Sequence, residues 1–478
     1  MNSFSPTEDT IAAIATAVSP GQGSIAVIRI SGSSAIEITK TIVHIPGKHD
    51  WSSHKVLYGH VTEENRKKYI DEVLILVMKG PRSFTGEDVV EIHCHGGIIP
   101  VQKILERILA FPSVRRAEPG EFSQRAVLNG RLSLTQAESI SELVSARSRK
   151  AAELAINGIE GNIQTTIQSI RKRLIEQLTE IEARIDFEED LPLLDEKHVK
   201  NEIVAIKKDL NELIDNAKRG SWVRSGLKVA LTGKPNVGKS SLMNRLSKQE
   251  KAIVTDLPGT TRDILESEIV LEGIPVTFID TAGLRDTKDI IEKIGISRTK
   301  KTLIHADLII LIFDYSSGWT NEDESILKQL PVNIPLLIVG NKSDLTNDQS
   351  FEKVPKYILK KENLVIISAK TGNGEDDLIN YLLKKCGSSQ THGLDIALNE
   401  RQLDLAKSTM KSLENINKVF DEKLPWDFWT IDLRQAINYL GELTGEDLTE
   451  SLLDNIFSKF CIGTVSYTHL TLPTKRIV

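Results

Sequence analysis

The spacing of apolar and polar residues changes along this chain. Up to about residue 120, short β-branched runs at 24–30 and 72–78 lie between turn residues, which is typical of strands. Residues 101–110 instead carry apolar side chains at helical spacing. We therefore predict an N-terminal domain of the α+β class.

A helical pattern follows. From Leu132 to about Arg184, apolar residues recur every three or four positions, which predicts a long helical stretch that breaks near Gly158 and Gly161. Residues 196–218 continue the pattern, and it returns at 396–421 and 430–459. The helical pattern is thus interrupted in the middle of the chain, which indicates a helical domain that contains an inserted domain.

The inserted part alternates strands and helices. Its apolar runs begin at Leu227, Ile274, Ala306, Ile334 and Asn363, and each run ends in polar loop residues. This alternation predicts an open parallel sheet with covering helices and with ligand-binding loops at the strand ends, a fold of the α/β class. The predicted division of the chain is 1–120, 121–220 (helical), 221–387 (inserted), 388–463 (helical) and an atypical tail at 464–478.

Composition narrows the possible functions. The 478 residues are too many for one core and suggest about three domains. The net charge of −6 argues against a broad surface for nucleic acid, so any RNA contact would need local basic patches. The three cysteines are far apart and form no CxxC motif, which suits a reducing compartment. We find no signal peptide or membrane span, and we predict a cytoplasmic protein.

A phosphate-binding motif lies at 233–240, where Gly-Lys-Pro-Asn-Val-Gly-Lys-Ser follows an apolar run and precedes a predicted helix. The glycines let backbone N–H groups surround phosphate oxygens, Lys239 would reach the β- and γ-phosphates, and Ser240 would ligate Mg²⁺. The nucleotide-binding residues predicted in this loop are Asn236, Val237, Gly238, Lys239, Ser240 and Ser241.

Three further segments indicate a guanine nucleotide. Asp280, with Thr281, Ala282 and Gly283, ends an apolar run, so that Asp280 can act behind Mg²⁺ and the Gly283 N–H can contact the γ-phosphate. In the Asn341–Asp344 motif, Asp344 can accept two N–H groups from guanine, a donor pair that adenine lacks. Backbone N–H groups near Ser368, Ala369 and Lys370 can bind the guanine oxygen. The four motifs together predict GTP binding, with Asn341 and Lys342 also in the site.

The loop before the second motif is a candidate switch. Its predicted nucleotide-binding residues are Thr255, Asp256, Leu257, Pro258, Gly259, Thr260 and Thr261, the last as a Mg²⁺ ligand. Leu284 follows Gly283, where Ras-type enzymes carry a water-orienting glutamine. Arg285, Asp286 and Glu292 are candidates to replace it, and the alternative is that they are ordinary solvated charges.

These motifs, read as GKPNVGKS, TDLPGTTRD, DTAGLR and NKSD, resemble the MnmE (TrmE) family of tRNA modification GTPases. The segments SFTGEDVVEIHCHGG and PGEFSQRAVLNGRL and the C-terminal FCIG resemble it as well, from about Thr10 to Gly463. The resemblance implies a folate-binding and dimerising N-terminal domain, a helical domain and an inserted P-loop GTPase domain of Ras-like fold. It further implies a homodimer that joins the flavoprotein MnmG in a heterotetramer.

The activity that the resemblance implies is the addition of a (carboxymethyl)aminomethyl group to carbon 5 of the wobble uridine of certain tRNAs. The one-carbon donor would be 5-formyl- or methylene-tetrahydrofolate, with Arg29, Glu91 and Arg131 at folate-contacting positions. For these three the alternative is structural salt bridging.

The resemblance also implies hydrolysis by K⁺-dependent dimerisation of the GTPase domains. The K⁺ ligands would be Asn236, Thr255, Leu257 and Thr260, while Glu292 falls on the water-orienting position. Arg285 and Cys461 complete the predicted catalytic set. His93 and His95 share one face of a predicted strand but lack a third ligand, which favours packing or hydrogen bonding over a metal site.

The chain end departs from the family pattern. Thr464 stands where the resemblance implies a lysine after Cys461-Ile462-Gly463, and residues 464–478 resemble nothing at the end of family members. We hypothesise that this tail is foreign sequence, which an uninterrupted native reading frame through Val478 would contradict. If the tail is native, the folate contact of a terminal lysine and the role of Cys461 are both in question.

Two other functions are compatible with the GTP-binding motifs. One is an Era- or Der-like GTP switch in ribosome assembly without modification chemistry, and the other is a scaffold that binds GTP without turnover. Era- and Der-like proteins carry basic RNA-binding modules beside the GTPase domain. The acidic balance, the SFTGEDVVE segment and Cys461 favour the modification enzyme.

Overall fold

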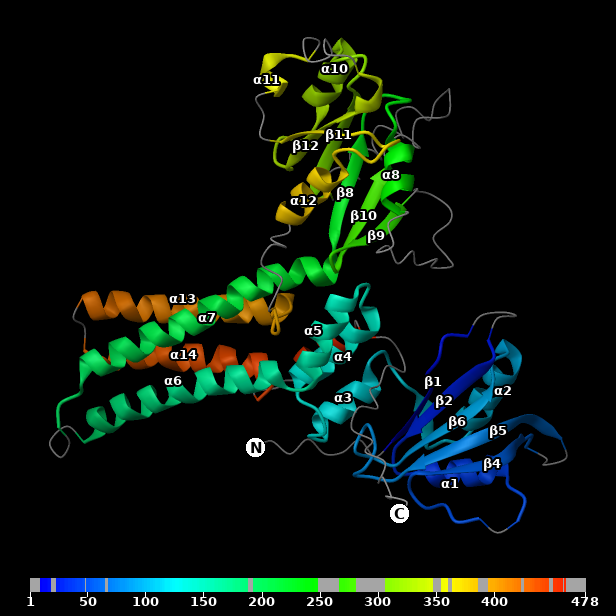
Figure 1. Ribbon diagram of the computed structural model, residues 1–478. Coiled ribbons are helices and arrows are strands. Elements are labelled where there is room, and N and C mark those ends of the chain that lie inside the picture. Colours follow the sequence, from blue (N-terminus) through cyan, green and yellow to red (C-terminus); the bar gives the residue numbers. More distant parts are fainter. Residues whose placement is uncertain are drawn as a thin grey trace, which may run out of the picture. The chain divides into compact units, whose positions relative to one another are not determined.

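The computed structural model describes twelve ranges and one further residue: 9–18, 23–47, 49–64, 68–187, 192–247, 266–280, 306–346, 354–359, 363–385, 394–422, 425–446, 450–458 and 460. The chain forms two compact units (Figure 1). Unit 1 consists of residues 1–145, 155–210 and 404–478, and unit 2 of residues 146–154 and 211–403.

Unit 1 contains the N-terminal sheet, whose strand order in the described residues is β3-β4-β5-β6-β2-β1-β7. Neighbouring strands are antiparallel, except that β1 and β7 are parallel. The strands and the two helices that complete this layer are β1 (Thr10–Ile14), β2 (Ile25–Ser31), α1 (Ala35–Ile42), β3 (Val43–His44), β4 (Lys55–Thr62), β5 (Tyr69–Met78), β6 (Val89–His95), α2 (Ile98–Leu109) and β7 (Val114–Arg116).

One face of this sheet forms a core with α1 and α2. Alternate strand residues such as Ile28 and Ile92 contribute to it, together with Ile42, Ile104 and Ile108 of the helices, and all five are fully buried. The α+β class is confirmed, with β2, β5 and α2 at the predicted places. Strands β1, β3, β4 and β7 and helix α1 were not predicted.

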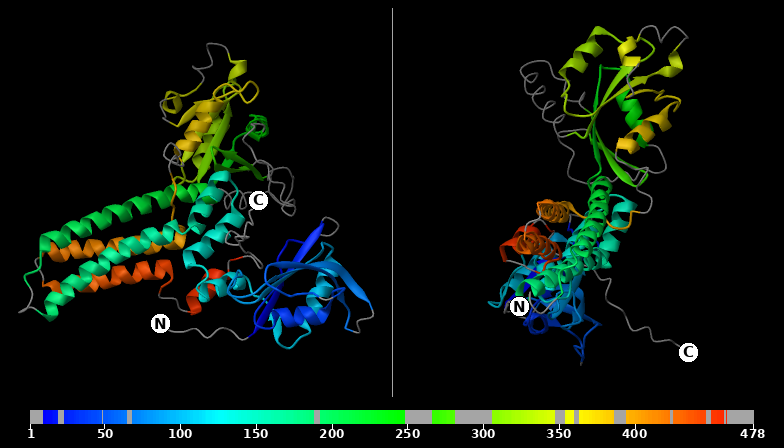
Figure 2. Two further views of the ribbon diagram at one scale, coloured as in Figure 1. Left: turned by 60° about the horizontal axis from the view of Figure 1, so that its bottom comes forward. Right: turned by 90° about the vertical axis from the view of Figure 1, so that its left-hand side faces the viewer.

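Unit 1 also contains a helix bundle of α6, α14, the part of α7 up to residue 210 and the part of α13 from residue 404, which run side by side (Figure 2). Helix α6 packs along α14, with Arg171 Nη1 2.6 Å from Glu446 Oε2. The helix bounds are α3 (Glu121–Leu128), α4 (Leu134–Ser145), α5 (Arg149–Ile159), α6 (Asn162–Asp186), α7 (Glu196–Ser225), α13 (Glu400–Asp421), α14 (Trp426–Thr444) and α15 (Glu450–Phe457).

Glycines in the left-handed conformation mark two helix boundaries. Gly161 (φ +89°) separates α5 from α6, which confirms the predicted break. The prediction of one helix over 430–459 was wrong, because α14 ends at Gly445 (φ +83°), whose N–H bonds to the Gly441 carbonyl. Glycine adopts this conformation without the Cβ penalty of other residues, so it ends helices that the hydrophobic period would continue.

Unit 2 contains the second sheet, with strand order β13-β12-β11-β8-β10-β9. All pairs are parallel, as predicted, except that β9 is antiparallel to β10, because Glu272 and Gly273 (φ +47° and +87°) form a hairpin turn. Its elements are β8 (Leu227–Thr232), α8 (Lys239–Ser247), β9 (Glu266–Leu271), β10 (Ile274–Asp280), β11 (Leu308–Asp314), α10 (Asn321–Gln329), β12 (Leu336–Asn341), the 3-10 turn η2 (Ser343–Leu345), α11 (Lys356–Leu359), β13 (Leu364–Ile366) and α12 (Glu375–Lys385).

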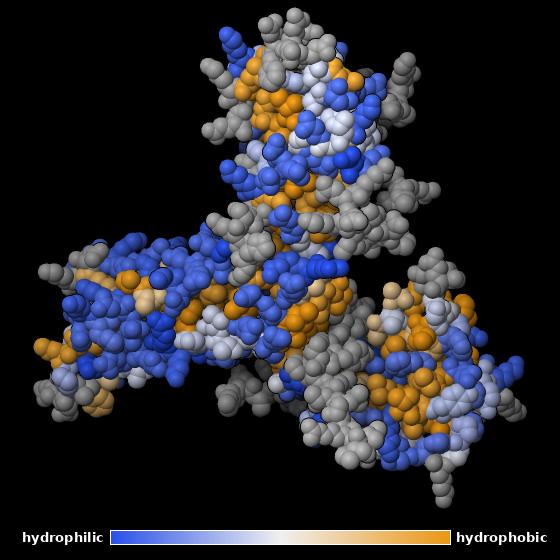
Figure 3. All heavy atoms as spheres, viewed as in Figure 1, coloured by the Kyte–Doolittle hydropathy of each residue, from blue (hydrophilic) through white to orange (hydrophobic). Residues whose placement is uncertain are grey.

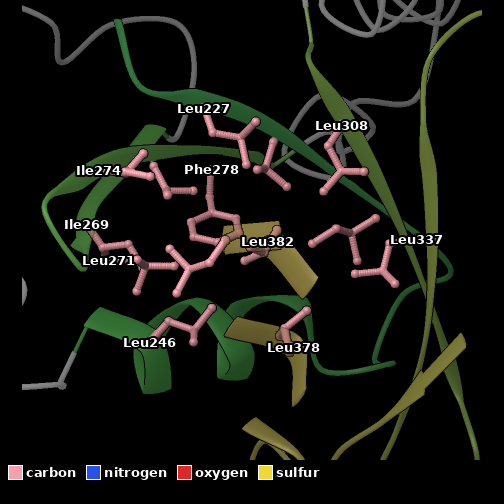
Figure 4. Close-up of a cluster of buried hydrophobic side chains, with 14 of the residues drawn as sticks. Leu227, Leu246, Ile269, Leu271, Ile274, Phe278, Leu308, Leu337, Leu378 and Leu382 are labelled. Atoms are coloured by element: carbon pink, nitrogen blue, oxygen red, sulfur yellow. The ribbon is translucent and has the colours of Figure 1, made fainter. Parts of the chain in front are cut away.

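The core of unit 2 joins strands and helices across one face of the sheet. Figure 4 shows Phe278 of β10 among side chains of the strands and of α8 and α12. Ala151 and Leu154, which lie at the start of α5, belong to the same core, and so do Leu394 and Ala397. The predicted α/β class is thus confirmed for this sheet, and its core includes residues from both flanks of the predicted insertion. No helix in the described ranges is long and apolar enough to cross a membrane.

Candidate functional site

The loop between β8 and α8 is the predicted phosphate-binding loop. Gly233 has φ +143°, and a Cβ there would lie 2.2 Å from the Ile312 carbonyl oxygen, so no other residue fits this close approach to β11. Asn236 (φ +62°) and Gly238 (φ +97°) also adopt positive φ values. The chain then enters α8 at Lys239, which directs the helix N-terminus and its free N–H groups at the loop.

Lys239 is buried and its ammonium group curls back along this loop. Its Nζ donates to the carbonyl oxygens of Gly233 (3.1 Å) and Lys234 (2.7 Å). Ser240 and Ser241 follow on the first turn of α8 and are exposed. The predicted lysine and hydroxyl groups therefore lie together at the amino end of one helix.

Asn341 connects the phosphate-binding loop to the loop after β13. Its side-chain Nδ2 donates to the Val237 carbonyl (2.8 Å), and its Oδ1 accepts the Ala369 N–H (2.9 Å). Ser368 Oγ donates to Asp344 Oδ1 (2.6 Å). The structure thus brings three of the four predicted segments together, because β8, β12 and β13 end at the same edge of the parallel sheet.

Sequence reasoning missed Asp314, which ends β11 between these loops. Its Oδ2 accepts a hydrogen bond from Lys342 Nζ (2.8 Å), and its Oδ1 accepts from the Ser316 N–H (3.0 Å) and hydroxyl (2.5 Å). Burial acts to raise the pKa of Asp314, but the hydrogen bonds from Lys342 and Ser316 outweigh it and lower the pKa to about 2. The available signal was a lone carboxylate that ends an otherwise apolar run.

The remaining predicted nucleotide contacts are only partly described. Strand β10 ends at Asp280, which pairs with Leu231 of β8, so its backbone lies beside the start of the loop. The residues that lie outside the described ranges are Thr255, Asp256, Leu257, Pro258, Gly259, Thr260, Thr261, Thr281, Ala282, Gly283, Arg285, Glu292 and Cys461. Their roles stay predictions.

Two of the three predicted folate contacts, Arg29 and Glu91, lie on the face of the N-terminal sheet opposite α1 and α2. Arg29 of β2 faces Glu91 of β6 in register, with Nε and Nη2 at 2.9 and 2.6 Å from Glu91 Oε1. Both side chains are buried, and the Arg29 guanidinium lies 5.4 Å from the centre of the Phe122 ring. Arg131 is separate, since its Nε donates to the Ser83 carbonyl (3.2 Å). The salt-bridge alternative therefore describes a contact that Arg29 and Glu91 do make.

His93 lies beside this pair. Its Nε2 is 3.4 Å from Glu91 Oε2, while His95 Nδ1 bonds to Asp71 (2.7 Å). Within the described ranges, no three His, Cys, Asp or Glu side chains are grouped so that they could hold a metal ion.

Replacing Arg29 with methionine is expected to destabilise the N-terminal sheet by about 3–5 kcal/mol, because the buried Glu91 carboxylate would lose the guanidinium that contacts its Oε1. Hydrogen exchange of β2 and β6 in the intact protein measures this change. Arg131→Met is the matched control, with an expected loss below about 1.5 kcal/mol. Equal protection of β2 and β6 in wild type and Arg29→Met would contradict the prediction.

The sheet, the glycine-rich loop before α8 and the Asn341–Asp344 turn define a P-loop protein of the GTPase class. Family models described as "GTP-binding protein TrmE N-terminus" and "MnmE helical domain" match residues 10–131 and 134–461. The chain belongs to the MnmE (TrmE) family.

Relatives agree with this assignment. A protein of Prochlorococcus marinus (strain NATL2A) named tRNA modification GTPase MnmE is 98% identical over 463 residues, which cover 97% of this chain and 100% of the relative. One from Prochlorococcus marinus (strain MIT 9303) with the same name is 59% identical over 463 residues, with the same two coverages.

A solved structure of Era from Aquifex aeolicus bound to GDP and AlF4⁻ is 29% identical. The match covers 39% of this chain and 66% of the Era chain, with a TM-score of 0.29.

Proposed function

We propose that this chain is an enzyme that hydrolyses GTP and uses hydrolysis in the modification of tRNA. The observation that carries the proposal is the junction at Asn341, which ties the phosphate-binding loop to the predicted guanine-binding loop in a chain of the MnmE family. The relatives' common name, tRNA modification GTPase, supports the second half.

Guanine recognition is assigned to Asp344. Its carboxylate would accept two N–H groups of the base, while Ser368 Oγ holds its other side through Oδ1. The Lys370 backbone N–H would bind the guanine oxygen, because the Ala369 N–H is donated to Asn341 Oδ1. The bond between Lys342 and Asp314 fixes the lysine beside this site, because a carboxyl with a pKa near 2 stays charged at neutral pH.

The phosphates are assigned to the loop and to Lys239. Ser240 is exposed directly after Lys239 and fits a Mg²⁺ ligand by its chemistry, with Thr261 as the second hydroxyl. Mg²⁺ would neutralise charge on the phosphates. Asp280 would act behind Mg²⁺ without ligating it directly, and the Gly283 N–H would contact the γ-phosphate. The role of the chain is to orient the phosphates with backbone N–H groups and one ammonium group.

Leu284 stands where Ras-type enzymes carry the water-orienting glutamine, so other groups must orient the water for hydrolysis. We assign the orientation of the water to Glu292. Arg285 belongs to the same switch segment and is assigned to the catalytic set with it. Asn236 adopts a left-handed backbone conformation in the loop, and its side chain is exposed. Its amide oxygen could therefore coordinate K⁺ together with Thr255, Leu257 and Thr260. K⁺ would supply positive charge to the transition state when two GTPase domains pair.

The tRNA chemistry is assigned to the N-terminal face and the chain end. Arg29, Glu91 and Arg131 would contact a tetrahydrofolate that donates the one-carbon unit, and Cys461 would act in the modification of carbon 5 of the wobble uridine together with MnmG. The same sheet face leaves apolar side chains exposed, which supports a homodimer through this domain (Figure 3). The exposed residues are Ile25, Val56, Tyr58 and Leu74.

We also propose the domain division given by the sequence, with the GTPase domain over 221–387 inserted into a helical domain of a cytoplasmic protein. Helix α7 ends at Ser225 and β8 begins at Leu227, which supports a boundary in this region.

Replacing K⁺ with Na⁺ tests the hydrolysis mechanism. We expect single-turnover GTP hydrolysis to be faster in K⁺ by about 10³-fold, the lower end of what an arginine finger supplies elsewhere. Asn236→Ala should remove the difference between the two salts and leave the slow rate. Equal and negligible rates in both salts would defeat the K⁺ mechanism.

The second half of the proposal needs tRNA. Mass analysis of wobble uridines from a strain that relies on this protein should show the modified base, and a Cys461→Ser strain should lose it. If the unaltered protein hydrolyses GTP but the wobble uridines of its strain are unmodified, the function that remains is that of a GTP switch.

A further inference from the structure

Lys234 occupies a variable position of the phosphate-binding motif, yet its side chain makes specific contacts. It leaves the loop and reaches the first turn of α10, where Nζ donates to Thr320 Oγ1 (2.7 Å) and lies 3.0 Å from Asp323 Oδ2. We call Lys234, Thr320 and Asp323 the Lys234 anchor. Lys234 and Thr320 are 86 residues apart in the chain.

Asp323 supplies the negative charge of the anchor, and its carboxylate is buried. Its side chain is fully buried, and its Oδ2 accepts from the Thr320 N–H (2.9 Å) and hydroxyl (2.6 Å), which closes a capping box on α10. Its Oδ1 has no hydrogen-bond partner among the described residues, where Lys234 is the cation paired with it. A buried carboxylate with one oxygen unsatisfied depends strongly on the positive charge beside it.

The backbone of Lys234 connects the anchor to Lys239, the predicted phosphate-binding lysine. The Lys234 carbonyl accepts the shorter of the two hydrogen bonds from Lys239 Nζ, at 2.7 Å. Its neighbour Gly233, which accepts the other, packs against the Ile312 backbone. The first turn of the loop is therefore held on one side by β11 and on the other by α10.

We infer that the Lys234 anchor positions the phosphate-binding loop for GTP. Lys234 is a positioning residue: it fixes the carbonyl that orients the Lys239 ammonium, and it does not itself contact the nucleotide. The inference rests on the proposed GTP function. A purely structural salt bridge would stabilise unit 2 without any effect on nucleotide affinity.

Lys234→Met in the intact protein is the first test, read out by the Kd for GDP and GTP and by single-turnover hydrolysis. We expect both Kd values to rise by about 10- to 100-fold. This is the loss of affinity expected when one charge-assisted hydrogen bond no longer holds the loop in place. Lys234→Arg retains the charge and should remain within about threefold of wild type. Lys328→Met is the matched control, because Lys328 pairs with Glu324 on the outside of the same helix (3.8 Å) and should change neither constant.

A second variant separates positioning from stability. Lys234→Met combined with Asp323→Asn leaves no buried charge unpaired, so it should fold even where the single variant does not. A raised Kd in the folded double variant supports the inference.

Two outcomes contradict these ideas, and they are distinguishable. Wild-type Kd values in the double variant would overturn the inference while GTP binding by the wild type stands. If the wild type itself binds no guanine nucleotide, the proposed function fails, and the inference fails with it.

Discussion

Replacing Lys239 with alanine is expected to slow single-turnover GTP hydrolysis by about 10⁴-fold, the range reported for removal of one cation that stabilises the phosphoryl transition state. Lys239 is buried and its ammonium group is held by two loop carbonyls, so its charge lies within the phosphate-binding loop. No neighbouring lysine of the described loop replaces it, since the Lys234 side chain is directed to α10. Rapid-quench measurement at saturating GTP gives the rate of the chemical step.

The control for this prediction is Lys384→Ala, which removes an exposed lysine from α12 in the same unit. Its hydrolysis rate should equal that of wild type. A loss below tenfold in Lys239→Ala would show that another group carries the transition-state charge.

Asp344→Asn is expected to change the ratio of GTP to XTP affinity by about 10⁴-fold, because a site built for specific hydrogen bonds rejects a base that leaves them unmade. Guanine presents two N–H donors to the carboxylate, whereas xanthine presents a carbonyl where guanine has its amino group. The asparagine amide can donate to that carbonyl. Competition of fluorescent GDP by GTP and by XTP measures both affinities.

Ser368→Ala provides the comparison for the specificity variant. It removes the hydroxyl that donates to Asp344 Oδ1 and leaves the carboxylate in place. Its preference for GTP should therefore persist, with affinity lowered by about tenfold. If Asp344→Asn keeps the preference of wild type, guanine is selected by other groups.

The sequence predicted the parts of the nucleotide site that lie directly after strands. Glycines, lysine and carboxylates at the ends of apolar runs identify loops at one edge of a parallel sheet, so 233–240, 341–344 and 368–370 could be brought together without coordinates. Structural salt bridging was the alternative for Arg29, Glu91 and Arg131, but residue spacing did not indicate that Arg29 and Glu91 pair with each other. The position of the Phe122 ring over the Arg29 guanidinium is likewise indicated by no residue pattern.

Contacts between distant segments could not be predicted. Lys234 with Asp323, and Asp314 with Lys342, depend on the order of strands in the sheet and on side-chain direction, which residue spacing does not give. The antiparallel edge strand β9 depends on the turn at Glu272 and Gly273, and the end of α14 on Gly445. Local turn chemistry overrode the longer hydrophobic periods at both places.

The composition of the unit 2 core has a consequence for how the chain folds during synthesis. Ala151 and Leu154 are synthesised before any strand of this sheet, while Leu394 and Ala397 are synthesised after all of them. The nascent strands therefore leave the ribosome with a core that is still incomplete at its C-terminal side, and their apolar faces stay exposed until Ala397 has emerged. A fragment cut at 221–387 would carry the same deficit permanently, so recombinant pieces of this unit should include both flanks to avoid aggregation.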